Sequence, residues 1–445
     1  MLERAKSDPA AEWEEAEEEE APEPRPEPRR YSWRQRAVAA LLAISFLLLL
    51  AWPFFLSGRV RWLLTPVPRL AGAHATPPVD LRAEDLRRAE EIVFGEVERE
   101  AFPGAALAVG QRSAIVLERG YGRTGWTRFA LPVDPDRTLY DLSSLTKVVA
   151  TTAAVMVLVD DGRMRLDDPL QRWLPTFRGG GREKITVRQV LTHTSGLPAA
   201  VLDLGEGTPR QRLERLIATV ELVDEPGAEV LYSDAGFVLL GEAAARAAGE
   251  PLPAFLRRRV WGPLGMSSTR YQPGLICRVC APTLSLRDGR PFAGKTNDPF
   301  ARELGGATGN AGLFSTAHDV ARFVAMLANG GELDGVRVVR ASTLAQFTRP
   351  GPRTGTRALG FEVFCREGTV PNHVPCRTEP YAYGHTGYTG TSFWIDPKSG
   401  AWVVLLTNRT YLPRAPNRIR LVRRRLFDTA TGQGPAPDSA RTDST

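Results

Sequence analysis

The feature that most constrains this 445-residue chain is a stretch without any charged residue, from Ala37 to Leu56. A helix of about 20 apolar residues is long enough to cross the hydrocarbon core of a bilayer, which is roughly 30 Å thick. Trp33, Trp52 and Trp62 lie near the two ends of the stretch, as in an aromatic belt. The sequence therefore predicts one transmembrane helix here.

The charges beside this stretch predict its orientation. Five Arg precede it closely and three follow it: Arg25, Arg29, Arg30, Arg34 and Arg36, then Arg59, Arg61 and Arg69. Because positive charge is retained in the cytoplasm, the folded body is expected on the extracytoplasmic side, in the periplasm or outside the cell. The small-residue triplet 73–75 lies 17 residues past the apolar stretch, which is too far for a typical signal peptidase site. An uncleaved single-pass signal anchor is therefore preferred over a cleaved signal peptide.

Composition divides the rest of the chain. Residues 1–30 hold 11 acidic and 5 basic residues in a Pro-rich context, which predicts a disordered tail. Residues 57–79 are expected to form a linker and residues 80–430 one folded domain. Residues 431–445 are a second low-complexity tail.

The overall net charge is +6, and no zinc-finger or RNA-binding motif is present, so no nucleic-acid partner is expected. One predicted helix near the C-terminus is strongly basic. It could contact anionic lipid or wall polymer, but a solvated face is the preferred interpretation. The Arg residues concerned are Arg414, Arg418, Arg420, Arg423, Arg424 and Arg425.

Hydrophobic periodicity predicts an α+β fold. Helices are expected over 80–100, 144–160, 319–329 and 417–428, and strands over 105–109, 114–118, 391–395 and 402–407. Since strands lie towards both ends of the domain, they are expected to pair in one antiparallel β-sheet flanked by helices. The middle of the chain would then form a helical lobe.

Four cysteines leave several possibilities open: Cys277, Cys280, Cys365 and Cys376. Outside the cytoplasm, structural disulfides are favoured over unpaired thiols, and a metal site is the least favoured reading because no His lies nearby. The pairing cannot be deduced from the sequence.

The motif Ser144-Leu-Thr-Lys147 offers a nucleophile and a proton carrier. The spacing of three residues puts both side chains on one face of a helix, and the apolar residues that follow predict that this helix is buried. The chain has only five Lys against 52 Arg. A desolvated Lys can lose its proton, which Arg cannot do. Lys147 therefore indicates proton transfer, whereas the alternative is an ordinary surface helix start.

Tyr232-Ser-Asp234 precedes a second apolar helix. One interpretation is an Asp N-cap beside a core Tyr. The other gives Tyr232 a catalytic role as a phenolate that is stabilised by Lys147 as a cation.

A third motif, His385-Thr386-Gly387, lies just before a strand. Gly387 lets a substrate approach the backbone closely. The amides of Ser144 and Tyr388 can then form an oxyanion hole. A Gly-rich hairpin is the alternative. Together, the three motifs predict acyl transfer through a covalent serine ester.

These motifs resemble those of the β-lactamase-related serine hydrolases, which include class C β-lactamases, penicillin-binding D-alanyl-D-alanine carboxypeptidases and esterases. The resemblance covers about residues 85–425. It extends to the strings 191–197 (LTHTSGL), 262–266 (GPLGM), 311–315 (AGLFS) and 384–391 (GHTGYTGT). It implies an antiparallel sheet with flanking helices and a helical lobe, a site between them, and no metal or other cofactor.

The branch of the family is less well defined. The strings 281–283 and 406–409 are similar to those of an N-acetylmuramyl-L-alanine amidase-like group. Asn297 and Asn310 stand where that group has His, which argues against amidase specificity.

Two departures from the family pattern concern the chemistry. Asp234 replaces an Asn, and an ionised Asp234 would keep Lys147 protonated and make Tyr232 the base; which of the two acts as base stays open. His385 replaces a Lys, and a neutral His binds a substrate carboxylate poorly. His193, in a Thr-His-Thr turn, is expected to be structural.

The sequence thus predicts a membrane-anchored serine hydrolase with Ser144, Lys147 and Tyr232 as catalytic residues. Asp234 and the segment 385–388 would bind the substrate and its oxyanion. A cell-wall peptide or related amide is the leading substrate, a small ester is the alternative, and a catalytically idle sensor of wall fragments is the rival from another class. The sequence leaves the exact substrate and the oligomeric state open.

Overall fold

The computed structural model describes residues 32–56, 69–71, 80–201, 203–274, 277–284, 291–351, 357–365 and 381–432. Contacts divide the chain into two compact units, 1–54 and 55–445, which are described separately. Helix α1 extends from Trp33 to Leu56, and its described apolar side chains, such as those of Leu42 and Leu47, are exposed. That this helix crosses a membrane stays a prediction.

Within the described residues, one helical stretch is long and apolar enough to span a membrane, namely Ser143–Asp160. This stretch is 83% buried inside the protein. It is therefore a core element of the second unit, as the apolar residues that follow the Ser144-Leu-Thr-Lys147 motif predicted.

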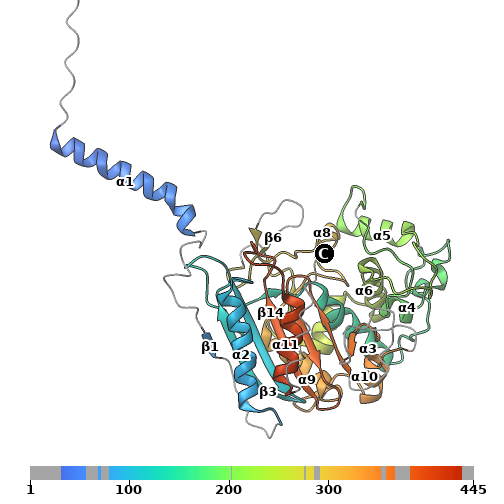
Figure 1. Cartoon of the computed structure of the whole chain (residues 1–445). Helices are drawn as coiled ribbons and strands as arrows, with labels where there is room; N and C mark the ends of the chain where they lie inside the picture. The colour runs from blue at the N-terminus through green and yellow to red at the C-terminus, as the bar shows by residue number, and fades with distance from the viewer. Residues whose placement is uncertain are drawn as a thin grey trace, which may run out of the picture. The chain divides into compact units, whose positions relative to one another are not determined.

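The second unit contains a seven-stranded antiparallel sheet in the order β1-β3-β2-β14-β13-β12-β11 (Figure 1). Its strands are β1 (Arg69–Ala71), β2 (Gly104–Gln111), β3 (Ala114–Gly122), β11 (Glu362–Cys365), β12 (Tyr381–Thr386), β13 (Ser392–Ile395) and β14 (Ala401–Thr407). Early and late strands pair at its centre, where Val403 of β14 faces Val109 of β2. The predicted pairing of the two ends of the domain is therefore confirmed.

Helices cover both faces of the sheet, because its central strands are apolar on both faces. Helices α2 (Ala83–Glu98) and α11 (Ile419–Ala430) lie side by side on one face (Figure 1). Leu107 of β2 packs in the cluster that includes these two helices. Its neighbour Ala106 points the other way, into the cluster that includes α9 (Ala317–Ala328).

The middle of the chain forms the helical lobe, and α4, α5 and α6 gather away from α2 and α11 (Figure 1). The remaining helices are α3 (Ala153–Asp160), α4 (Val187–Leu191), α5 (Pro209–Thr219), α6 (Asp234–Ala248), α7 (Leu252–Leu256), α8 (Pro299–Glu303) and α10 (Ala341–Thr348). Three small sheets pair β4 (Tyr140–Asp141) and β5 (Arg270–Tyr271) with β8 (Leu313–Ser315), β6 (Thr283–Leu284) with β7 (Pro291–Phe292), and β9 (Glu332–Leu333) with β10 (Val336–Arg337). The α+β prediction is confirmed.

The helix predicted over 144–160 is wrong in one respect, since it is not regular. Ser143–Leu145 form a 3₁₀ turn, Lys147–Thr152 form wider π turns, and α-helical geometry begins only at Ala153. Ser144 therefore lies in the 3₁₀ turn and Lys147 at the start of the π segment, so the two residues do not share one regular helix.

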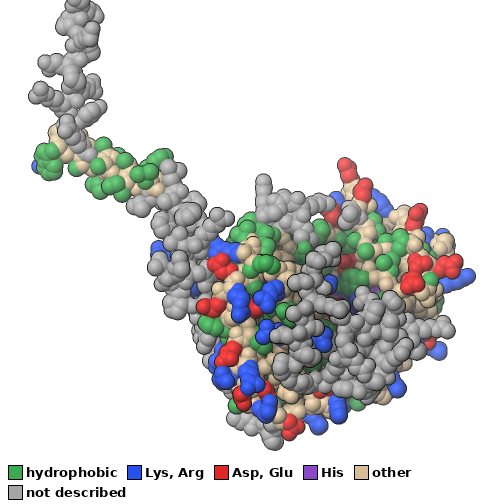
Figure 2. All heavy atoms as spheres, in the orientation of Figure 1, with side chains coloured by type: hydrophobic (Ala, Val, Ile, Leu, Met, Phe, Trp, Pro, Cys, Tyr) green, Lys and Arg blue, Asp and Glu red, His purple; other side chains and the backbone are tan. Residues whose placement is uncertain are grey.

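Several of the Arg residues near the C-terminus have local partners. Arg414 pairs with Glu100 at 3.0 Å, and Arg424 lies 3.8 Å from Asp428. Figure 2 shows basic and acidic side chains intermixed on the face of α2 and α11, as expected for a solvated face. Arg423 differs from its neighbours, because it reaches the end of strand β12.

Cys277 and Cys280 form a disulfide. The structural interpretation is therefore confirmed for this pair. The side chain of Cys365 and the whole of Cys376 lie outside the described residues.

Candidate active site

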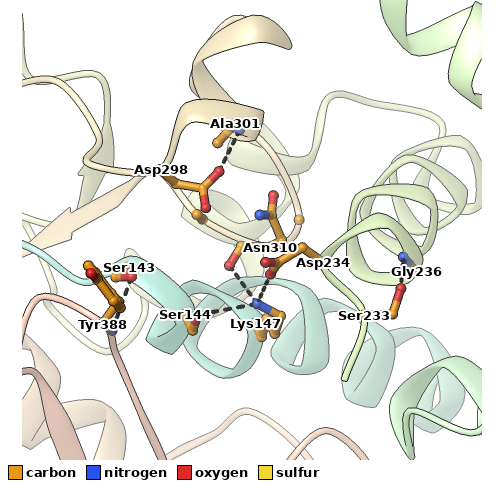
Figure 3. A network of polar contacts seen from close by, with 12 residues as sticks. Ser143, Ser144, Lys147, Ser233, Asp234, Gly236, Asp298, Ala301, Asn310 and Tyr388 are labelled. Carbon is orange, nitrogen blue, oxygen red and sulfur yellow. Dashed lines mark hydrogen bonds and ion pairs between the residues drawn. The ribbon is translucent and has the colours of Figure 1, made fainter. Parts of the chain in front are cut away.

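Lys147 is fully buried at the centre of a polar network (Figure 3). Its Nζ donates to Ser144 Oγ at 3.3 Å, to Asp234 Oδ1 at 2.5 Å and to the Asn310 carbonyl at 3.3 Å. These three acceptors and the Tyr232 side chain surround the ammonium group. The structure thus brings together three of the predicted site residues.

The surroundings of Lys147 favour its charged form. Burial lowers the pKa of the Lys147 amine, but the Asp234 carboxylate and the Tyr232 oxygen outweigh burial and raise this pKa above its usual value. An ammonium group cannot accept the Ser144 proton. The electrostatics therefore argue against Lys147 as the base.

Tyr232 lies between two cations. Lys147 Nζ is 4.7 Å from the centroid of its ring, and the guanidinium carbon of Arg357 is 5.3 Å from it. Burial raises the pKa of the Tyr232 phenol above its usual value, and the Asp234 charge acts in the same direction. The Lys147 charge and hydrogen bonds from Lys147 and Ser144 oppose this increase only in part. Of the two cations, Lys147 is the one that offsets part of the cost of forming a phenolate in this position.

The start of α6 positions both Tyr232 and Asp234. Ser233 is the N-cap residue, and its Oγ accepts an amide proton from the first turn at 2.9 Å (Figure 3). The alternative that made Asp234 the cap is therefore wrong, and its carboxylate pairs with Lys147 instead. His193 stacks on Tyr232 at 4.4 Å, and its Nδ1 accepts the Ser233 amide proton at 3.0 Å. His193 is thus a satisfied structural residue, as expected.

His385 is buried at the end of β12. Its Nδ1 donates to the Thr386 carbonyl at 2.8 Å, because a carbonyl can only accept. Burial lowers the pKa of His385 to about 4, although Glu362, 4.0 Å from Nε2, acts in the opposite direction. The imidazole is therefore neutral at physiological pH. Thr386 donates to Glu362 at 3.3 Å.

Gly387 lies where two segments of the chain nearly touch. A Cβ atom at this position would lie 2.5 Å from the Leu142 carbonyl oxygen and 2.1 Å from Thr391 Oγ1. Arg423 of α11 donates to the Gly387 and Thr391 carbonyls at 2.8 Å each. Gly387 is therefore required so that these two segments of the chain can approach each other. The close approach of a substrate to its backbone stays a prediction.

The two amides predicted to form the oxyanion hole differ, because among the described residues only the Tyr388 amide already has a hydrogen-bond partner. The Tyr388 amide donates to Ser143 Oγ at 3.2 Å (Figure 3). The Ser144 amide donates to none of the acceptors in the described part of the chain. The Tyr388 side chain is 51% exposed, and Arg409 lies over its ring.

Sequence reasoning missed three residues that belong to this site. Arg357 comes from a loop in which nothing distinguishes it from many other Arg residues. Asp298 caps α8 and faces Asn310 (Figure 3). Its pKa is raised, mainly by burial and also by the negative charge of the nearby Asp234. The Asn residues quoted for the amidase-like group provided a signal for this segment. Asp141 is fully buried, which raises its pKa to about 6.

One cluster among the described residues could hold a metal ion, formed by Glu118, Asp136 and His318. His318 Nδ1 lies 3.1 Å from both Glu118 oxygens, which is also the geometry of an ion pair. These residues belong to β3, α9 and the loop between β3 and β4, none of which carries the residues around Lys147.

A cavity of about 570 Å³ lies between α5, α6, α7 and the segment 304–309. Ser144, Tyr232 and His385 do not line it. The chemistry therefore belongs to the network around Lys147 and not to this cavity.

The Beta-lactamase family model matches residues 89–427. The chain belongs to the Beta-lactamase family. The resemblance inferred from the motifs is confirmed, and the chain is a serine hydrolase of the β-lactamase-related type.

Relatives agree with this assignment. A Salmonella agona protein, provisionally named D-alanyl-D-alanine carboxypeptidase, is 29% identical over 377 residues, which cover 77% of this chain and 86% of that protein. Two solved structures share the fold with a TM-score of 0.63. One is a β-lactamase/D-alanine carboxypeptidase from Pseudomonas syringae, with 20% identity over 80% of this chain and 100% of that one. The other is a penicillin-binding protein homologue from Caulobacter crescentus, with 22% identity over 83% of this chain and 100% of that one.

Proposed function

We propose that the chain is a membrane-anchored hydrolase in which Ser144 is acylated by an amide or ester, with a cell-wall peptide as the leading substrate. The observation that carries this proposal is the position of Lys147 Nζ, 3.3 Å from Ser144 Oγ and 2.5 Å from Asp234 Oδ1, beside the Tyr232 ring. A buried Lys within hydrogen-bond distance of a serine hydroxyl group, beside a Tyr side chain that can serve as the proton acceptor, is an arrangement that supports nucleophilic catalysis.

Each step of the reaction conserves atoms and charge. Tyr232, as a phenolate stabilised by Lys147, takes the Ser144 proton while Oγ forms a bond to the carbonyl carbon. The proton then passes from Tyr232 to the leaving nitrogen or oxygen as that group's bond to the carbonyl carbon breaks. Water repeats both steps on the acyl-enzyme, releasing the acid and restoring Ser144.

A peptide with a free carboxyl terminus fits the charges near the site. His385 is neutral and attracts a carboxylate weakly, whereas Arg357 is a described cation next to Tyr232 that also pairs with Glu362 at 3.4 Å. The Salmonella relative is provisionally named as an enzyme that acts on such a peptide. We therefore infer that Arg357 supplies the positive charge that His385 lacks.

The first experiment tests acylation itself. A fluorophosphonate probe is expected to label one residue, Ser144, and Ser144→Ala is expected to abolish the label. The absence of label on the folded wild-type protein would favour the idle sensor instead.

A second experiment tests the substrate class. Peptides ending in D-alanyl-D-alanine are compared with their C-terminal amides, and both with small esters and nitrocefin. The free acid is expected to be hydrolysed with at least tenfold higher kcat/KM than the amide, and Arg357→Gln should remove this difference while Arg357→Lys keeps part of it. Equal turnover of both peptides, with faster turnover of esters, would identify an esterase.

The membrane anchor is part of the same proposal. Helix α1 has 24 residues, which corresponds to about 36 Å. This length exceeds the roughly 30 Å of a bilayer core. The Arg residues before it favour an extracytoplasmic position for the hydrolase domain.

A further inference from the structure

Ser143 is a residue that the mechanism above does not use. It directly precedes Ser144 and is 5% exposed. Its backbone has a φ of +50°, which residues other than Gly rarely adopt. Its amide donates to Asp141 Oδ1 at 2.9 Å, and Thr391 Oγ1 donates to the neighbouring Leu142 carbonyl at 2.9 Å. Strained backbone that is held in place by its surroundings is typical of functional sites.

The hydroxyl group of Ser143 has a defined orientation. The Tyr388 amide donates to Ser143 Oγ at 3.2 Å, so this oxygen acts as the acceptor (Figure 3). The hydroxyl proton must therefore point elsewhere. Within the described ranges, no acceptor is recorded for this proton. It is the one donor of this turn, besides the Ser144 amide, that is still available to a substrate.

We propose that the Ser143 hydroxyl is a donor of the oxyanion hole, oriented by the Tyr388 amide and acting beside the Ser144 amide. As negative charge develops on the carbonyl oxygen of the intermediate, this hydroxyl donates a hydrogen bond to it. A preoriented donor of this kind stabilises the transition state more than the bound substrate. The inference rests on the proposed acylation of Ser144.

The test measures the acylation rate with a fluorophosphonate, whose phosphoryl oxygen occupies the oxyanion position. Ser143→Ala is expected to slow labelling by about 10- to 100-fold, which is below the 10²–10³ typical of a lost oxyanion donor because the Ser144 amide remains. Ser143→Gly is the second variant, since Gly adopts a φ of +50° without strain and should keep the native turn.

Three outcomes separate the possibilities. Slow labelling by both folded variants supports the proposal. Labelling at the wild-type rate, or faster, overturns it, because the hydroxyl would then only fill the hole until a substrate displaces it. Failure of the wild-type protein to react at all would overturn the proposed function, and this inference with it.

Discussion

Asp234 controls the charge of Lys147, and through it the identity of the base. Its carboxylate lies 2.5 Å from Nζ and is the main contribution that raises the pKa of the amine against burial. In Asp234→Asn, burial should dominate and lower the pKa of Lys147.

We predict that Asp234→Asn lowers kcat/KM at pH 7 by at least tenfold. Lys147 should then lose its proton, and with it the charge that stabilises the Tyr232 phenolate, at a lower pH than in the wild-type protein. The alkaline limb of the pH–rate profile should therefore shift to lower pH by about one unit or more. Stopped-flow acylation as a function of pH measures both effects. A gain in activity at neutral pH would instead identify Lys147 as the base.

His385 links the site to the pH dependence of stability. Its pKa is lowered from 6.5 to about 4 in the folded state, so between these pH values the unfolded chain binds more protons than the folded one. Stability contributed by this residue is therefore present above pH 6.5 and is lost as the pH falls towards 4.

We predict that the wild-type protein loses about 2 kcal/mol more than His385→Asn when the pH is lowered from 7.5 to 5. Comparing the two proteins removes the opposite contribution of Asp141, whose raised pKa stabilises the folded state as the pH falls through about 6. Urea unfolding at both pH values measures the difference. Parallel curves would mean that His385 is already charged in the folded state.

At the scale of elements, the end of β12 and the 3₁₀ turn at Ser143–Leu145 act as one structural unit. Gly387 allows their contact, Thr389 Oγ1 donates to the Asp141 carbonyl at 2.7 Å, and Arg423 of α11 fixes the β12–β13 turn from behind. The position of Ser144 therefore depends on segments more than 200 residues away in sequence.

We predict that Gly387→Ala reduces the acylation rate by more than 100-fold, because its methyl group displaces the Leu142 carbonyl and hence the adjacent Ser144 turn. Gly335→Ala is a matched control, since no atom lies within 4 Å of a Cβ placed there. Its φ of +77° makes a small loss of stability expected, without loss of activity. The measurements are fluorophosphonate labelling and thermal unfolding. Normal labelling by Gly387→Ala would show that the two segments move independently.

The sequence predicted the elements that carry their own periodicity. Helices α2, α9 and α11 and strands β2, β3, β13 and β14 lie within a few residues of the predicted ranges, because each has a regular apolar pattern. The short strands β4, β5 and β8 have two or three residues each and carry no such pattern. The irregular turns at 143–152 were also missed, because burial and contact with β12 shape them.

The same distinction holds for the site. Sequence reasoning found two pairs of site residues because the members of each pair are close together in one motif. These pairs are Ser144 with Lys147 and Tyr232 with Asp234, and the structure brings them together. Arg357 was not found, because its place beside Tyr232 depends on a long-range contact. Local spacing therefore predicts the reacting groups better than it predicts the charges that surround them.

At the scale of the whole molecule, two units have different physical requirements. The hydrolase unit buries its apolar residues in its own clusters, on both faces of the sheet. Helix α1 does not, since its described side chains from Val38 to Leu47 are exposed. A bilayer would remove this apolar surface from water.

We predict that the full-length protein is recovered in the membrane fraction and resists carbonate extraction, whereas a variant that begins at residue 57 is soluble. Both should react with fluorophosphonate at the same rate, because Ser144 and its partners all lie beyond the anchor. Protease added to intact spheroplasts should cleave the hydrolase unit if it faces outwards, with a cytoplasmic protein as the protected control. Protection of the hydrolase unit would reverse the proposed orientation, since the flanking Arg residues would then lie on the opposite sides. Extraction of the full-length protein by carbonate would instead mean that the apolar surface of α1 is covered by protein rather than by lipid.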